Sequence, residues 1–328
     1  MVVVVGFCGS IIYTDLQTYD SKLTPAIGWT DTNDYIHMYY GEPATGIRSY
    51  RPLVPFLARF VPAPPASLYS AEHAFDRFSR AAAHFAVLNF VFLVGACIVL
   101  LIYQEGLGLH RRTAFLGVLL FLGSQTVVRS AGLPMVDAGF FFFFLLCLIA
   151  VQRSNSWLLL VGMTVGVLAK EEVLLTIPMI VLSTLPRRTK VQLLAASIPS
   201  LAVFALVVSG AGVPLDSAMQ PTLRTLMSVA GAADLFACFG LAWIPAGYAL
   251  LRVDVPPLLR RWSWLLPIVL VLVFVTNASW TRNVFTAFPA VFPLAALGLT
   301  EWVRRSIPAA TEEPEQRWRI PKPQRMEP

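Results

Sequence analysis

Long apolar runs alternate with short polar breaks along almost the whole chain. The runs fall at about residues 2–13, 83–103, 113–128, 135–151, 157–169, 173–185, 191–210, 228–251, 263–279 and 284–303. A helix that crosses a bilayer needs about 20 mostly apolar residues, and it satisfies its backbone hydrogen bonds locally. The pattern therefore predicts an all-α, polytopic membrane protein with about ten transmembrane helices.

Composition supports the membrane assignment and narrows the function. The 328 residues are 56% hydrophobic and 13% charged, with a mean hydropathy of +0.66, whereas soluble domains carry about 25% charged residues. The net charge of +6 comes from short loops and the C-terminal tail, so we interpret it as a topology signal and not as a nucleic-acid surface. The four cysteines lie in apolar runs without paired spacing, which favours small core residues over disulfides or metal ligands.

The loops carry an asymmetric distribution of basic residues. With a cytoplasmic N-terminus, the inner loops contain Arg111, Arg112, Arg153, Arg187, Arg188, Lys190, Arg252, Arg260 and Arg261. The outer loops contribute mainly Arg129, Lys170, Arg224 and Arg282. The positive-inside rule then predicts a membrane domain over 1–303 with both termini cytoplasmic, a large first extracytoplasmic loop at 14–80, and a disordered tail at 304–328.

Two segments allow two interpretations each. Residues 66–85 have apolar positions at helical spacing, which fits either an interfacial amphipathic helix or an extension of the next span. Residues 157–185 form either one helix broken at Lys170-Glu171-Glu172 or two short helices that meet there.

Residues 29–52, WTDTNDYIHMYYGEPATGIRSYRP, hold a density of ionisable groups that is rare in this chain. The predicted topology brings them to the outer face together with further charged residues at span ends. The candidate site residues are Asp31, Asp34, Arg48, Arg51, Asp137, Lys170, Glu171 and Arg282. A carboxylate beside a hydroxyl group can act as a general base, and Arg or Lys can hold a phosphate. Such a mixture suits a lipid-phosphate donor and a hydroxyl acceptor.

Each of these residues also has a structural interpretation. Arg48 and Arg51 can be solvated or bind lipid headgroups, and Arg282 can anchor the start of its span in the interface. TDTND is a good turn sequence, so Asp31 and Asp34 can be turn or cap residues. Asp137 can stabilise the N-terminus of its helix, and Lys170-Glu171-Glu172 can neutralise itself. His37 is more typical of a hydrogen-bonded histidine than of a metal ligand. The sequence shows no metal-ligand pattern and indicates no cofactor, although it does not exclude a divalent metal.

Several segments resemble one family of membrane enzymes. They are the short first span followed by TDTNDYIHMYYG, then SYRPLVPFLARF, GLPMVDAGFFFFFLLCLIA, VGMTVGVLAKEEVLL and RNVFTAFPAVFPLAALGL. In these segments the chain resembles the GT-C superfamily of integral-membrane glycosyltransferases, which includes protein O-mannosyltransferases and aminoarabinose transferases. The chain is shorter than the family's usual plan and lacks its soluble C-terminal domain.

The resemblance implies an inverting transfer of a hexose or pentose from a polyprenyl-phosphate donor at the extracytoplasmic face of a bacterial inner membrane. Asp34, or else Asp31, would be the base that activates the acceptor. Lys170 and Arg282 would bind the donor phosphate, while Asp137 and Glu171 would order the site. The implied partners are the donor, membrane lipids and a lipid, glycan or protein acceptor. Two other functions fit the sequence: a transporter or flippase of lipid-linked or anionic cargo, and a non-catalytic subunit of an envelope assembly.

Overall fold

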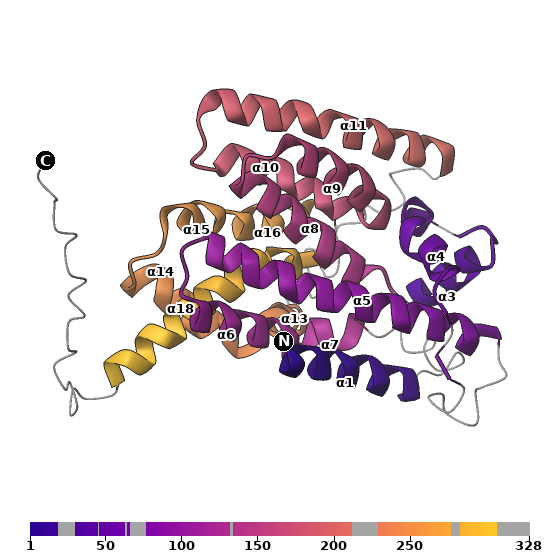
Figure 1. Cartoon of the computed structure of the whole chain (residues 1–328), viewed down its shortest axis with the longest axis horizontal. Coiled ribbons are helices and arrows are strands. Elements are labelled where there is room, and N and C mark those ends of the chain that lie inside the picture. Colours follow the sequence, from indigo (N-terminus) through magenta and orange to yellow (C-terminus); the bar gives the residue numbers. More distant parts are fainter. Residues whose placement is uncertain are drawn as a thin grey trace, which may run out of the picture.

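The computed structural model describes residues 1–18, 30–44, 46–62, 64–65, 77–131, 134–211, 229–276 and 283–306. This part of the chain contains helices and no strands (Figure 1). Its first half comprises α1 (Val2–Thr18), α3 (Thr30–Tyr39), α4 (Leu53–Ala58), α5 (Arg77–Gly106), α6 (Arg111–Leu122), α7 (Gln125–Ser130) and α8 (Asp137–Gln152). The second half comprises α9 (Ser156–Ala169), α10 (Thr176–Leu182), α11 (Arg187–Ala211), α13 (Val229–Phe239), α14 (Trp243–Arg252), α15 (Pro257–Trp262), α16 (Leu265–Thr276) and α18 (Phe288–Ser306).

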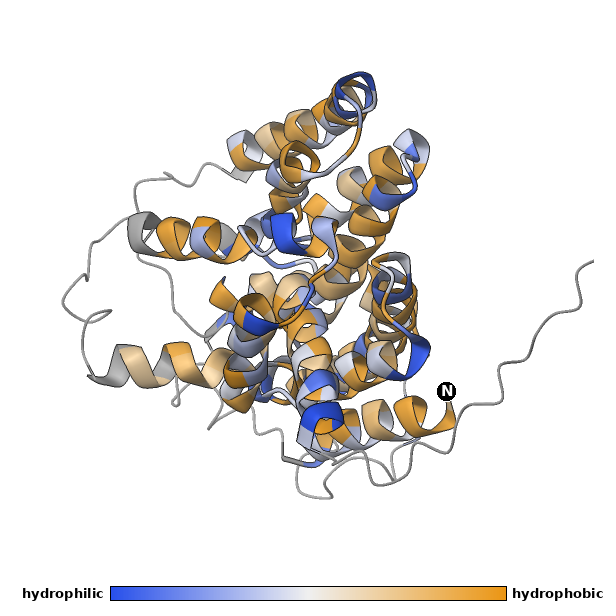
Figure 2. Cartoon of the chain, turned by 90° about the vertical axis from the view of Figure 1, so that its left-hand side faces the viewer, coloured by the Kyte–Doolittle hydropathy of each residue, from blue (hydrophilic) through white to orange (hydrophobic). Residues whose placement is uncertain are grey.

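Four helices of the described residues are long and apolar enough to cross a membrane. They cover Arg77–Gly106, Arg187–Gly210, Leu235–Arg252 and Phe285–Ser306, and three shorter apolar helices accompany them. Figure 2 shows hydrophobic residues along most helices and hydrophilic ones gathered at helix ends and connections. The all-helical, membrane-type architecture predicted from the sequence is therefore confirmed. The count of about ten spans is not established by these helices.

Each predicted apolar run contains helix, but several boundaries differ. The run at 113–128 divides into α6 and α7 because Ser124 caps a new helix, its Oγ accepting from the Val127 N–H at 3.4 Å. The first helix reaches Thr18, five residues beyond its apolar run. The last helix continues to Ser306, and Glu301 forms ion pairs with Arg304 and Arg305 one turn further along it. The rest of the predicted tail, 307–328, lies outside the described residues.

The two alternative interpretations are partly resolved. From Arg77 onward the chain is one continuous helix with the predicted span at 83–103, whereas residues 66–76 lie outside the described part. At Lys170 the backbone is extended, with φ −164° and ψ 133°, and α9 ends. The chain continues in the 3-10 turn η3 (Glu171–Leu175). Gly166 leaves room for Val173 of this turn, since a Cβ at Gly166 would lie only 3.1 Å from Val173 Cγ1. Residues 157–185 thus form two short helices that meet at Lys170.

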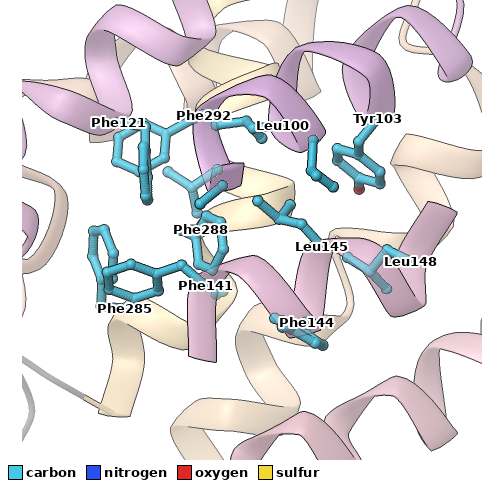
Figure 3. Packing of buried hydrophobic residues seen from close by; sticks show 14 of the residues in the cluster. Leu100, Tyr103, Phe121, Phe141, Phe144, Leu145, Leu148, Phe285, Phe288 and Phe292 are labelled. Atoms are coloured by element: carbon cyan, nitrogen blue, oxygen red, sulfur yellow. The ribbon is translucent and has the colours of Figure 1, made fainter. Parts of the chain in front are cut away.

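Aromatic side chains fill the centre of the helical bundle (Figure 3). The Phe-rich start of α8 places Phe141 against Phe288 of α18, with ring centroids 5.4 Å apart and an edge-to-face arrangement. Phe121 of α6 lies 5.3 Å from Phe288 in the same cluster. Lipid tails are as apolar as these rings, so close packing and ring geometry hold the helices together in place of water exclusion.

The helical bundle has two separate ends. Figure 1 places α3 and α4 at one end of the molecule and α14 and α15 at the other. Helix α5 runs between the ends, and its 30 residues correspond to a length of about 45 Å. The candidate site lies at the α3–α4 end, where α8 begins and α9 ends.

Candidate functional site

Asp31 and Asp34 lie on helix α3 and not in a turn, so the turn interpretation of TDTND is wrong for these residues. Three residues apart on a helix, the two carboxylates share one face. Arg48, in the 3-10 turn η1 (Gly46–Tyr50), donates from Nε to Asp31 Oδ1 and from Nη1 to Asp34 Oδ2, each at 2.7 Å. All three side chains are partly exposed, Asp34 by 15% and Arg48 by 27%.

Three buried residues of α3 fix the position of this pair of carboxylates. Tyr35 and Ile36 are fully buried, as is Thr32, which donates from Oγ1 to Met135 Sδ at 3.7 Å. Met135 lies just before α8, and its carbonyl oxygen accepts from Asn89 of α5 at 3.2 Å. These contacts explain why the segment is helical despite its turn-like composition: tertiary burial outweighs local preference.

Arg51 connects the α3–α4 segment to the turn after α9. Its Nε donates to Glu171 Oε2 at 2.8 Å, its Nη2 donates to Glu171 Oε1, and its Nη1 donates to the Tyr35 hydroxyl at 3.0 Å. The Arg51 side chain is only 6% exposed. A buried guanidinium needs partners for its donors, and the fork of Arg51 matches the carboxylate in both position and charge.

Lys170 and Asp137 form a second, deeper ion pair. Lys170 Nζ lies 3.0 Å from Asp137 Oδ1 and 2.9 Å from Glu172 Oε1, and the Lys170 and Asp137 side chains are 3% and 4% exposed. The ammonium also lies 5.1 Å from the centroid of the Phe140 ring, within the range of a cation–π contact. Asp137 is the first residue of α8, and Val136 at the N-cap makes no side-chain capping bond. Asp137 therefore pairs with Lys170 as well as starting its helix.

Ion pairing sets the direction in which the pKa values of Arg48, Arg51 and Glu171 shift. Burial alone lowers the pKa of Arg48 and Arg51, but the adjacent carboxylates outweigh burial and raise the pKa of both. Burial alone raises the pKa of Glu171, but the Arg51 guanidinium outweighs this effect and lowers that pKa. Arg48, Arg51 and Glu171 are therefore all charged at neutral pH.

The described cluster has more acidic than basic groups. Its carboxylates are Asp31, Asp34, Asp137, Glu171 and Glu172, and its cations are Arg48, Arg51 and Lys170. Each of the three cations forms an ion pair with at least one of these carboxylates.

A smaller cluster joins the end of α3 to the start of α5. Glu42 accepts from Arg77 and is paired with His37 Nδ1, and these contacts lower the pKa of Glu42, with Arg77 as the larger cause. Tyr40 donates from its hydroxyl to the Arg77 carbonyl oxygen at 2.7 Å, and the guanidinium lies 4.3 Å from the Tyr40 ring centroid. His37 is thus a hydrogen-bonded histidine, as its sequence context suggested.

The structure brings seven of the eight predicted site residues together: Asp31, Asp34, Arg48, Arg51, Asp137, Lys170 and Glu171. The eighth, Arg282, lies outside the described residues. Two participants were not among the predicted site residues, Tyr35 and Glu172, although each is adjacent in sequence to a predicted one. Within the described ranges, no group of three or more His, Cys, Asp or Glu side chains is arranged to hold a metal ion.

Comparisons with protein-family models, with curated proteins and with solved structures found no match to this chain, so the site is interpreted from its own geometry.

Proposed function

We propose that this chain is a membrane glycosyltransferase that moves a sugar from a polyprenyl-phosphate donor to a hydroxyl acceptor. The observation that carries the proposal is the position of Asp34, a partly exposed carboxylate oriented by Arg48 at one end of an apolar helical bundle. A carboxylate held in this way can act as a general base, which takes up a proton from the acceptor. The sequence resemblance to the GT-C superfamily supports the same reaction class.

In this proposal the partly exposed residues Asp34, Asp31 and Arg48 take part in the reaction. Asp34 accepts the proton of the acceptor hydroxyl while the acceptor oxygen attacks the anomeric carbon. The bond between that carbon and the phosphate oxygen breaks, and the polyprenyl phosphate leaves with both electrons, which inverts the anomeric centre. Arg48 orients Asp34 through one N–H group and Asp31 through another. Asp31 is the alternative base, because it shares the same helix face and the same arginine.

The buried ion pairs have a different role. Lys170 and Arg51 are bonded to carboxylates and nearly inaccessible, so we assign them to positioning and not to direct contact with donor phosphate. Arg51 positions the α3–α4 segment, and Lys170 joins α8 to the end of α9. Arg48 is the cation of the cluster that a phosphate reaches most easily. The sequence resemblance assigns Arg282 to the donor phosphate as well.

We also propose the membrane topology of the chain. It has about ten spans, a first extracytoplasmic loop at 14–80 and cytoplasmic termini, and it lies in a bacterial inner membrane. The separation of the candidate site from the basic turn between α5 and α6 supports this orientation, since these features lie at opposite ends of α5.

A transfer assay tests the function. Wild-type protein, Asp31→Asn and Asp34→Asn are purified in nanodiscs and given radiolabelled polyprenyl-phosphate sugars with an envelope-lipid extract as acceptor. We expect transfer by the wild type and its loss in one aspartate variant at unchanged melting temperature. Full activity in both variants would contradict the assignment of the base.

The same preparation separates the alternative functions. Movement of labelled donor across liposomes without formation of product would favour a transporter or flippase. Stable co-purification with a partner enzyme, together with tolerance of every outer carboxylate substitution, would favour an assembly subunit.

A further inference from the structure

A cavity of about 500 Å³ lies far from the candidate site, between α1, α5 and α6. Its lining residues are Met1, Val4, Cys97, Leu101, His110, Arg111, Arg112, Phe115 and Val118. The N-cap and first residues of α6 contribute the basic members, and the apolar ones come from the N-terminus and the three helices. A volume of this order is typical of sites for small molecules.

The residues that line the cavity are of two kinds, apolar and basic. Its floor is apolar and buried: Val4, Cys97 and Val118 are 1–3% exposed. Leu101 lies one helical turn from Cys97, and Phe115 lies one turn from Arg111, so each helix presents a single face to the space. The lining thus combines apolar side chains of α1, α5 and α6 with basic side chains at the start of α6.

The mouth is basic and exposed. His110, Arg111 and Arg112 are all exposed where α6 begins, and Gly108, with φ +90°, allows the tight turn that delivers them there. The acidic neighbour is Glu105, whose Oε1 lies 3.7 Å from Arg111 Nε, an exposed and loose contact. Within the described part of the chain, Arg112 has no ion pair. Positive charge at the mouth thus exceeds negative charge.

We propose that this cavity binds one anionic phospholipid, with the headgroup phosphate at Arg111 and Arg112 and an acyl chain against Leu101, Phe115 and the α1 face. Charge complementarity selects the anionic headgroup, because basic pockets at the membrane interface attract anionic lipid. The apolar floor selects a lipid over a free phosphate, since a small anion leaves the apolar walls uncovered. This inference is independent of the proposed transferase activity.

Native mass spectrometry of the full-length protein in detergent tests the proposal. Phosphatidylglycerol and phosphatidylcholine with identical acyl chains are titrated separately, and inorganic phosphate is then added as a competitor. The variant is Arg111→Gln/Arg112→Gln. The matched control is Arg187→Gln/Arg188→Gln, which removes two exposed adjacent arginines from the start of another helix, α11. A second variant, Leu101→Trp, fills the cavity without removing charge.

We expect preferential retention of phosphatidylglycerol, and an affinity about tenfold lower in the Arg111/Arg112 variant. The Arg187/Arg188 control should keep the wild-type affinity, Leu101→Trp should lose the lipid, and inorganic phosphate should not displace it. Equal binding of the two lipids, equal losses in the two arginine variants, displacement by inorganic phosphate, or full retention by Leu101→Trp would each overturn the proposal.

Discussion

Arg51 holds the carboxylate of Glu171 through two N–H donors, although 120 residues separate them in sequence. The pair joins the segment between α3 and α4 to the turn at which α9 ends. Since Arg51 also donates to Tyr35, next to Asp34 in α3, it links the buried ion pairs to the accessible carboxylates. We therefore expect the position of Asp34 to depend on the contacts of Arg51 with Glu171 and Tyr35, which do not involve Asp34 itself.

Arg51→Ala should destabilise the folded protein by about 3 kcal/mol, because breaking a buried ion pair leaves the partner charge uncompensated. The free energy of unfolding, measured by titration with a denaturing detergent, checks this value. Arg59→Ala is the matched control, since Arg59 lies at the end of α4 and is exposed. We expect it to cost less than about 1 kcal/mol. Equal costs for the two variants would show that the Arg51 pair has no special structural role.

Lys170 and Asp137 should be energetically coupled. In a double-mutant cycle with Lys170→Met and Asp137→Asn, we expect a coupling free energy above about 1 kcal/mol, because both side chains are buried and in direct contact. The exposed pair Glu301–Arg304 serves as the comparison, and its coupling should stay below about 0.5 kcal/mol. Coupling as weak for the buried pair as for the exposed one would contradict its role in joining α8 to α9.

Stability should depend on Glu42 in a defined pH range. The pKa of Glu42 is lowered by Arg77 and His37, so its contribution is fully present above the ordinary glutamate pKa of 4.5 and is lost as the pH falls through the lowered value. The melting temperature of wild type should therefore exceed that of Glu42→Gln at neutral pH, and the difference should shrink below pH 4.5. A difference that grows on acidification would have the wrong sign for this ion pair.

Opposite membrane faces should be accessible at the two ends of the molecule. Pro43 follows α3 and Thr184 lies in the turn between α10 and α11, and both are exposed. In intact cells an impermeant maleimide should label Pro43→Cys, and it should label Thr184→Cys only after permeabilisation. The four native cysteines are buried and should give little background. Labelling of both positions from the same side would rule out the proposed topology.

The hydropathy pattern predicted the helices because a membrane-type helix needs a long run of apolar residues, and such a run is visible in the sequence. The exceptions have local or tertiary causes. Gly123 and Ser124 are a visible helix-break signal within an apolar run. The helical state of Asp31 and Asp34 is less visible, because it rests on burial of Tyr35 and Ile36 against distant elements.

The candidate site was predictable as a set of residues but not as a set of pairs. The topology predicted from the sequence places these charges on one face, which was enough to nominate Asp34, Arg48 and Lys170. Which cation meets which carboxylate depends on helix packing, so the Arg51–Glu171 and Lys170–Asp137 pairs required coordinates. Tyr35 became part of the site only through its hydroxyl contact with Arg51.

The most direct test of the central claim is sugar transfer by Asp34→Asn measured beside Asp254→Asn, an exposed carboxylate in the loop between α14 and α15. A polyprenyl-phosphate sugar donor and an acceptor extract are supplied to both variants and to wild type in nanodiscs. The proposed function predicts transfer by wild type and Asp254→Asn, and a loss of at least about a hundredfold in Asp34→Asn at an unchanged melting temperature. Transfer by Asp34→Asn at the wild-type rate would contradict the proposed role of this carboxylate as the base.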